Sequence, residues 1–180
     1  MDRREFMKLS LTATGGLSLG FYLPGPRAAA AAPAFAPNAW LRIDPDNRIT
    51  FICPQNEMGQ DVHTSLATLV AEELDCDWSR VTTEYPTPGQ NLARTGVWGN
   101  FSTGGSRGIR ESHDYVRKGG AAARMMLVQA AANEWKVPVA ECSAANSIVT
   151  HGPSGRKLSY GKLVEAASKL PVPEKPALKD

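Results

Sequence analysis

The chain has 180 residues, which suits one domain with a short appendage. It is 42% hydrophobic and 21% charged, a composition typical of soluble globular proteins and not of fibrous or disordered ones. The 20 Lys and Arg residues exceed the 18 Asp and Glu residues by two. This excess lies near the start of the chain, which has Arg3, Arg4, Lys8 and Arg27 but only Asp2 and Glu5. The rest of the chain is neutral and has no basic cluster, which excludes nucleic acid as a partner.

Three cysteines, Cys53, Cys76 and Cys142, lie far apart in the sequence and form no Cys-x-x-Cys pair. We therefore predict neither a disulfide framework nor a zinc site, and expect buried free thiols. The three histidines share no metal-ligand spacing, so we expect them to be structural or surface residues and assign no metal ligand.

The start of the chain has the three parts of an export signal. A basic beginning with Arg3-Arg4 and Lys8 precedes an uncharged stretch from Leu9 to Leu23, and small residues follow up to Ala30. The uncharged stretch is short and rich in Gly, Ser and Thr, whereas a membrane span needs about 20 apolar residues. The pattern resembles a twin-arginine signal, which predicts cleavage near Ala30 and export of the folded protein to the periplasm by the twin-arginine machinery.

After the signal, the patterns predict an α+β fold of β-hairpins and mixed strands with about four helices. Residues 31–39 are rich in Ala and Pro and predict a loose N-terminal arm. Strands at 41–43 and 49–52 flank a turn of Pro, Asp and Asn, and so predict a hairpin. Apolar residues at helical spacing predict a helix over 61–74, and alternating residues predict a strand over 80–85.

The second half begins with a glycine-rich segment, 89–108, which predicts a long irregular loop of the functional kind. A helix follows over 109–136, with an Ala-rich face suited to close packing and a kink at Gly119-Gly120. The remaining elements are a helical turn at 138–141, a hairpin of 147–151 with 156–158, and a helix over 159–170 capped by Ser159. The predicted organisation is a signal over 1–30, an arm over 31–39, a partial domain over 40–170, and a Pro-rich linker over 171–180 leading to another segment.

Two loops are candidates for binding a ligand. The first, Pro54 to Thr64, joins a strand to a helix, and its Gly59 lets the backbone approach a ligand closely. Free N–H groups at the helix start suit an anion, and the Gln60 amide offers both a donor and an acceptor. The alternative is that Asp61 simply caps the helix.

The second loop runs from Phe101 to Ser112 and contains Gly104-Gly105-Ser106 just before a helix. It matches neither the P-loop nor the dinucleotide-binding fingerprint, so ATP and NAD are unsupported. The alternative is an ordinary glycine-rich turn.

Several segments together resemble one known family. They are residues 52–60 running into 69–75, then 102–106, 109–110, 127–135, 137–142 and 158–163, together with the opening signal. These segments are similar to the molybdopterin-binding large (beta) subunit of molybdenum hydroxylases of the isoquinoline 1-oxidoreductase and aldehyde dehydrogenase type, within the xanthine oxidase family. The resemblance implies that residues 40–170 form part of a molybdopterin-binding domain.

The resemblance also implies site residues, because Gly-Gln-Gly and Thr-Gly-Gly-Ser loops wrap the cofactor in that family. The implied cofactor-binding residues are Gly59, Gln60, Thr64, Gly104, Gly105 and Ser106. Asp61 stands where the family usually has a second glycine, so we expect its side chain to turn away and cap the helix. We assign no catalytic residue, since the family's general base lies in a later segment, and we expect Glu72 and Glu73 to be surface charges.

The implied function is that of an N-terminal segment of an exported molybdenum hydroxylase that oxidises an aldehyde or N-heteroaromatic substrate with oxygen from water. The implied cofactor is molybdopterin with molybdenum, either plain or as the cytosine dinucleotide, and the 180-residue chain alone is expected to be inactive. The implied partners are the remaining segments of the large subunit, a small 2Fe–2S subunit and a cytochrome c electron acceptor. The alternative is a non-enzymatic periplasmic cofactor-binding or interaction module, or an inactive truncated remnant.

Overall fold

The fold is that of a computed structural model, which describes residues 35–38, 40–99 and 101–180. These residues belong to one unit, Pro33–Asp180. The predicted export signal over residues 1–30 lies outside the described residues. No described helix combines the length and the apolar character needed to cross a membrane.

The first sheet has four strands in the order β1 (Phe35–Asn38), β2 (Leu41–Ile43), β3 (Ile49–Ile52) and β4 (Val81–Glu84). The β2–β3 hairpin is confirmed, and β4 confirms the strand predicted over 80–85. Because β3 and β4 are parallel, the chain crosses between them through helix α2. The prediction of a loose arm is wrong for residues 35–38, since β1 pairs with β2 in the antiparallel sense.

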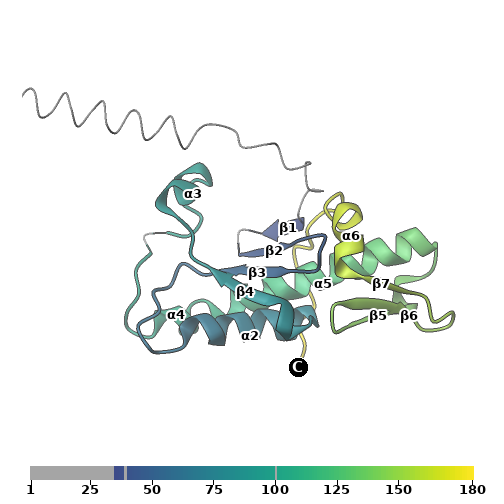
Figure 1. Cartoon of the computed structure of the whole chain (residues 1–180), viewed down its shortest axis with the longest axis horizontal. Coiled ribbons are helices and arrows are strands. Elements are labelled where there is room, and N and C mark those ends of the chain that lie inside the picture. Colours follow the sequence, from purple (N-terminus) through teal and green to yellow (C-terminus); the bar gives the residue numbers. More distant parts are fainter. Residues whose placement is uncertain (1–34, 39, 100) are drawn as a thin grey trace, which may run out of the picture. The chain divides into compact units, whose positions relative to one another are not determined.

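Two long helices pack against each other beside this sheet, α2 (Val62–Leu74) and α5 (His113–Trp135) (Figure 1). Both helices were expected, and the buried residues of α5 include the predicted stripe of Val116, Ala123, Leu127 and Ala130. The helix is not interrupted at Gly119-Gly120, because α5 runs continuously for 23 residues. A Cβ at Gly120 would lie 2.7 Å from the Val70 carbonyl oxygen, so this glycine instead lets α2 approach.

The later part of the chain forms a second sheet and a last helix. A short 3₁₀ turn, η2 (Val139–Glu141), leads to strands β5 (Cys142–Ala145), β6 (Ile148–His151) and β7 (Lys157–Ser159), and these lead to α6 (Tyr160–Ala167). The predicted hairpin is β6–β7, and β5 adds a third antiparallel strand that the sequence reading missed. Ser159 holds the N-cap position of α6, but its side chain makes no capping hydrogen bond.

The glycine-rich segment predicted as one long loop contains two short helices, α3 (Pro88–Ala93) and α4 (Arg107–Arg110). The Thr87 side chain accepts a hydrogen bond from the Gln90 backbone, and the Gln90 side chain accepts one from Thr87. This is a capping box, with Pro88 at the first helical position. The sequence therefore contained a signal for the start of α3, although the many glycines of the segment led to the prediction of a loop. A short 3₁₀ turn, η1 (Trp78–Arg80), precedes β4.

The Pro-rich C-terminal residues contain no helix or strand, yet they bind to α2 and α5. The Lys179 backbone N–H donates to Glu73 at 3.1 Å, and the Lys179 carbonyl accepts from Arg117 at 2.6 Å. Arg124 donates to the Ala177 carbonyl at 3.1 Å. The prediction that Glu73 is a surface charge is wrong, because Glu73 is 1% exposed and accepts from Arg117 as well as from the tail.

Candidate cofactor-binding site

The first candidate loop joins β3 to α2 and is organised around the carboxylate of Glu57. One carboxylate oxygen accepts the Gly59 backbone N–H at 2.8 Å and the Asp61 N–H at 3.1 Å. The other accepts the His63 N–H, in the first turn of α2, at 3.3 Å. The loop thus folds back so that an anionic side chain of the chain itself meets the positive end of the helix.

The pKa of Glu57 reflects this arrangement. Partial desolvation acts to raise its pKa, but the backbone hydrogen bonds from His63 and from residues 59–61 outweigh it, and the pKa is lowered from its ordinary value. Glu57 is therefore ionised at neutral pH.

The Gln60 side chain is also used within the first loop. Its amide oxygen accepts from the Met58 N–H at 2.6 Å, and its amide nitrogen donates to the Asn56 carbonyl at 2.6 Å. The sequence reading expected this amide to face a ligand. In the structure it braces the turn, which leaves one N–H and one lone pair for further contacts.

The expectation that Asp61 caps α2 is wrong. Asp61 occupies the N-cap position with a left-handed φ of 56°, and its side chain makes no capping hydrogen bond. Glu57 supplies the acceptor instead, from four residues earlier. A left-handed conformation costs less for glycine than for other residues, so a glycine would fit this position without strain.

The second candidate loop ends in a tight turn before α4. Gly105 and Ser106 both have a φ of 57°, with Ser106 at the N-cap of α4. Two arginine side chains of α4 donate hydrogen bonds to the turn and so stabilise it. Arg107 donates to the Gly104 carbonyl at 3.3 Å and to Ser102 Oγ at 2.5 Å, and Arg110 donates to the Gly105 carbonyl at 3.2 Å.

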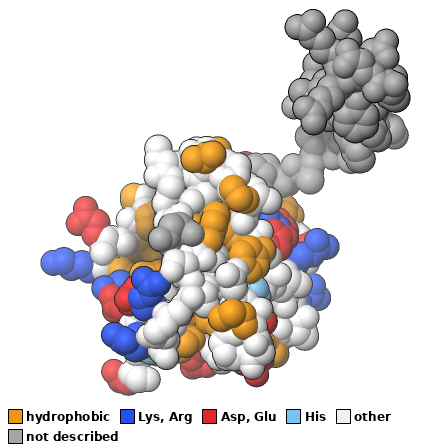
Figure 2. Space-filling model, turned by 90° about the vertical axis from the view of Figure 1, so that its left-hand side faces the viewer, with side chains coloured by type: hydrophobic (Ala, Val, Ile, Leu, Met, Phe, Trp, Pro, Cys, Tyr) orange, Lys and Arg blue, Asp and Glu red, His pale blue; other side chains and the backbone are white. Residues whose placement is uncertain are grey.

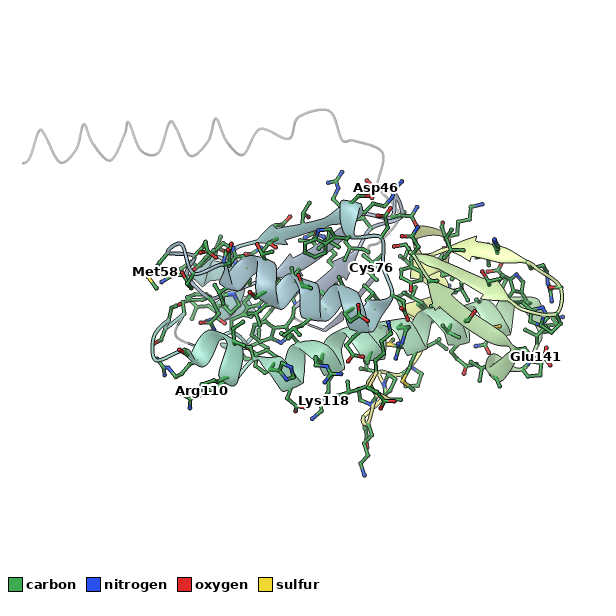
Figure 3. The ribbon with its side chains drawn as sticks, turned by 90° about the horizontal axis from the view of Figure 1, so that it is seen from below. Asp46, Met58, Cys76, Arg110, Lys118 and Glu141 are labelled. Atoms are coloured by element: carbon green, nitrogen blue, oxygen red, sulfur yellow. The ribbon has the colours of Figure 1, made fainter. Side chains whose placement is uncertain are left out.

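The tertiary structure brings the two loops into direct contact. The Asn56 backbone N–H donates to Thr103 Oγ1 at 2.8 Å, and Thr103 Oγ1 donates to Gln55 Oε1 at 3.4 Å. A Cβ at Gly108 would lie 3.0 Å from Val62 Cγ2, so this glycine lets α4 approach the start of α2. Figure 3 shows Met58 of the first loop and Arg110 of α4 at the same end of the described residues.

A cavity of about 300 Å³ lies between the two loops. Its lining residues are Met58, Gln60, Val62, Thr103, Gly104, Ser106, Gly108 and Ile109. Of the predicted site residues, Gln60, Gly104 and Ser106 line it, whereas Gly59 and Gly105 are their immediate neighbours. Thr64 does not line it and is exposed on α2.

The sequence reading missed the apolar part of this cavity. Met58, Val62 and Ile109 lie within three residues of predicted site residues, but an apolar side chain in a loop or at a helix start gives no signal of its own. Figure 2, which views this end, shows apolar side chains gathered on the surface, and Met58 and Ile109 are both exposed. The cavity therefore combines apolar side chains with polar backbone groups, as ligand sites commonly do.

Gly104 tests whether the cavity fits a ligand that approaches the backbone. It has no left-handed φ, and a Cβ built on it would meet no described atom within 4 Å apart from its chain neighbours. Neither the backbone conformation nor packing within the described residues requires a glycine here. The backbone at Gly104 is therefore open to close approach by a flat group such as a pterin.

The other chemically active side chains near the site are engaged elsewhere. Cys53 lies buried at the end of β3, and burial raises its pKa to about 11, so it is a neutral thiol at neutral pH. His63 Nε2 lies 2.6 Å from the Gln55 carbonyl oxygen. Among the described residues, no three His, Cys, Asp or Glu side chains form a group able to hold a metal ion.

Two facing loops with a cavity between them, on an α+β scaffold, form a candidate cofactor-binding domain. Comparison with known sequences identifies the family of this domain. The chain belongs to the molybdopterin cofactor-binding domain family, which matches residues 4–179. The resemblance inferred from the motifs is therefore confirmed, and so is the α+β fold class.

Two curated relatives are similar along most of the chain. The isoquinoline 1-oxidoreductase subunit beta of Brevundimonas diminuta is 35% identical over 182 aligned residues, covering 97% of this chain and 22% of the relative. The membrane-bound aldehyde dehydrogenase (pyrroloquinoline-quinone) of Gluconacetobacter polyoxogenes is 34% identical, covering 91% of this chain and 21% of the relative. The chain thus spans about a fifth of the length of these relatives.

Solved structures share the fold at low sequence identity. The reconstituted CO dehydrogenase from Oligotropha carboxidovorans has a TM-score of 0.54 and 16% identity, covering 77% of this chain and 17% of that chain. A Cu,Mo-CO dehydrogenase in its carbon monoxide reduced state also has a TM-score of 0.54, with 17% identity, covering 68% of this chain and 15% of that chain.

Proposed function

We propose that this chain is a segment of the large subunit of a molybdenum hydroxylase that oxidises an aldehyde or an N-heteroaromatic compound with oxygen from water. The main support is the cavity between two loops in a chain that is 35% identical to an isoquinoline 1-oxidoreductase beta subunit. Both curated relatives are named as oxidoreductases of these substrate types.

In this proposal the segment holds one side of the molybdopterin. The contact residues are Gly59, Gln60, Gly104, Gly105 and Ser106, with Thr64 at the outer edge of the first helical turn. When bound, the molybdenum centre supplies the oxygen transfer and takes up the electrons of the substrate. This chain orients the group through the Gln60 amide and the loop at Gly104 and Ser106, and Met58, Val62 and Ile109 exclude water. The substrate pocket and the general base belong to other segments.

The proposal includes export and partners. A twin-arginine signal over residues 1–30, cleaved near Ala30, would deliver the loaded protein to the periplasm. The name of the membrane-bound relative supports a location outside the cytoplasm. The proposed partners are the remaining segments of the large subunit, a small 2Fe–2S subunit and a cytochrome c acceptor, with the cofactor plain or as its cytosine dinucleotide.

The first test is the intact mass of the native gene product from the cell envelope fraction, with molybdenum, pterin and quinone measured on the same sample. We expect a polypeptide several times longer than this chain that carries molybdenum and pterin. A product carrying quinone without molybdenum would replace the proposed cofactor. A metal-free product ending at Asp180 would support the non-enzymatic module or inactive remnant instead.

The second test is Gln60→Ala in the complete enzyme. Loss of both bracing hydrogen bonds loosens the first loop, and we expect molybdenum per polypeptide to fall several-fold. Gln129→Ala is the matched control, because this amide lies on α5 and bonds to Asn133 at 2.8 Å, away from the cavity. Equal molybdenum contents in the two variants would contradict the assignment of Gln60.

A further inference from the structure

The start of α2 already carries an anion, the Glu57 side chain. The helix has 13 residues, and the Gly59, Asp61 and His63 N–H groups at its start all point to this one carboxylate. A helix start of this kind attracts anions, and the sequence reading assigned that role to a bound ligand. Two opposite roles for Glu57 follow from its position, and they predict opposite effects of removing it.

In the first role, Glu57 competes with the ligand. An anionic group of the cofactor would then have to displace the carboxylate from the helix, and removing Glu57 would strengthen binding. In the second role, Glu57 forms the loop in advance, so that the helix start is satisfied by the chain and the ligand meets a loop that is already ordered. Removing Glu57 would then weaken binding.

Three observations favour the second role. Glu57 and Gln60 brace the same turn, and the Gln60 amide lines the cavity while the Glu57 carboxylate does not. Asp61 makes no capping bond, so no other side chain at the N-cap replaces Glu57 on the first turn. Asp61 also carries a negative charge beside the same helix start, which disfavours a second anion arriving there.

We propose that Glu57 is a positioning residue that caps α2 with its own carboxylate and so holds Gly59 and Gln60 in place for the cofactor, leaving the α2 helix start closed to the cofactor's anionic group. This inference rests on the proposed function only for the identity of the cofactor. The capping role itself concerns this chain alone, and it can be tested in protein made without molybdate.

The test uses Glu57→Ala and Glu57→Gln in the full polypeptide, with hydrogen exchange of the peptide over 57–63 and with molybdenum and pterin content. In Glu57→Ala we expect exchange of this peptide to quicken about tenfold, with or without cofactor. We expect molybdenum and pterin per polypeptide to fall to less than about a third of the parent value.

The Gln variant separates positioning from general damage. One carboxylate oxygen accepts two of the three hydrogen bonds, so a glutamine carbonyl in its place keeps both and loses only the bond from His63. We therefore expect Glu57→Gln to retain at least about half of the parent cofactor content and to show a smaller rise in exchange.

Glu134→Ala is the control, because it removes the same charge from an exposed position on α5. It should leave both measurements and the unfolding temperature unchanged, while the Glu57 variants should still unfold in one cooperative transition. Equal cofactor content in Glu57→Ala would overturn the proposal, higher content would also support the competing role, and unchanged exchange would overturn the capping role. A parent protein with no molybdenum or pterin would contradict the proposed function, while the exchange result would still decide the role of Glu57.

Discussion

At the scale of single residues, glycine serves two opposite purposes in this protein. At Gly120 and Gly161 an added Cβ would lie 2.7 Å from the Val70 carbonyl oxygen and 2.2 Å from that of Pro45, so these glycines allow elements to touch. At Gly104 an added Cβ would meet no described atom within 4 Å other than its chain neighbours, so that glycine faces open space. Only the surroundings in the folded chain separate a packing glycine from one that faces open space.

A substitution at Gly120 tests the packing role. We expect Gly120→Ala to lower the free energy of unfolding by about 1–3 kcal/mol, because α2 must move away from a backbone contact. Gly89→Ala is the matched control in helix α3, where the nearest atom, Thr87 Oγ1, is 3.9 Å from the added Cβ. It should be neutral or slightly stabilising. The measurement is denaturant unfolding, and equal losses in both variants would show that the helix contact is unimportant.

Thiol reactivity provides a second test at this scale. Burial raises the pKa of Cys53 to about 11 and that of Cys76 to about 12, so at pH 8 only about 1 in 1,000 and 1 in 10,000 of these groups are thiolates. The pKa of Cys142 is also raised by desolvation, but its side chain is less buried than that of Cys53. We expect iodoacetamide to label Cys142 first, as read by peptide mass spectrometry. Labelling of Cys53 first would contradict the buried position at the end of β3.

At the scale of elements, α2 connects the first candidate loop with the C-terminal tail. Its first turn is capped by Glu57 of the loop that follows β3, and its last turn carries Glu73, which holds the C-terminal tail together with Arg117. Asp75, just after the helix, binds Lys179 at 2.5 Å and Arg124 at 3.2 Å. The predicted linker is thus tied to α2 by charged groups, because a buried carboxylate needs donors and the tail supplies one.

Removing the buried carboxylate tests this tie. We expect Glu73→Ala to cost about 2–4 kcal/mol of unfolding free energy, since Arg117 loses its carboxylate partner and the Lys179 N–H loses its acceptor. Glu73→Gln should recover part of this loss. The neighbouring Glu72→Ala is the control, because the Glu72 side chain is exposed and forms a solvent-screened ion pair with Lys179 Nζ at 3.3 Å, so its loss should stay below about 1 kcal/mol. Similar losses at the two positions would mean that the tail contact contributes little.

At the scale of the whole described unit, α5 joins the two sheets. It packs against α2 on one side and against α6 and the second sheet on another (Figure 1). Six of its buried residues, Leu127 among them, belong to one core cluster. A core shared in this way should unfold as one, because neither sheet keeps its buried face without the helix.

A substitution that creates a cavity beside α5 tests whether the described unit unfolds cooperatively. Leu127 is fully buried, so we expect Leu127→Ala to lower stability by about 2–5 kcal/mol while circular dichroism and tryptophan fluorescence still report one transition. Met125→Ala on the same helix is the control, because Met125 is 36% exposed and should lose under about 1 kcal/mol. Two separated transitions in the Leu127 variant would show that the sheets are independent.

Local patterns were sufficient for much of this protein. Alternating residues and turn chemistry predicted the β2–β3 hairpin, and apolar spacing predicted α2 and α5 with their buried faces. Motifs around Gly59-Gln60 and Gly104-Gly105-Ser106 indicated the family, which the comparison confirmed. These features depend on neighbours in the sequence, and so the sequence by itself determined them.

Contacts between distant residues were decided only by the tertiary structure. The burial of Glu73 and the docking of the tail depend on partners far along the chain. Strand β1 and the third strand of the second sheet each pair with the strand that follows them, although the sequence patterns did not predict them. The side chain that caps α2 is that of Glu57 and not that of Asp61, because Asp61 has a left-handed backbone conformation. No residue preference in the loop predicted that conformation. A sequence states which groups need partners, but only the folded chain decides which partner is within reach.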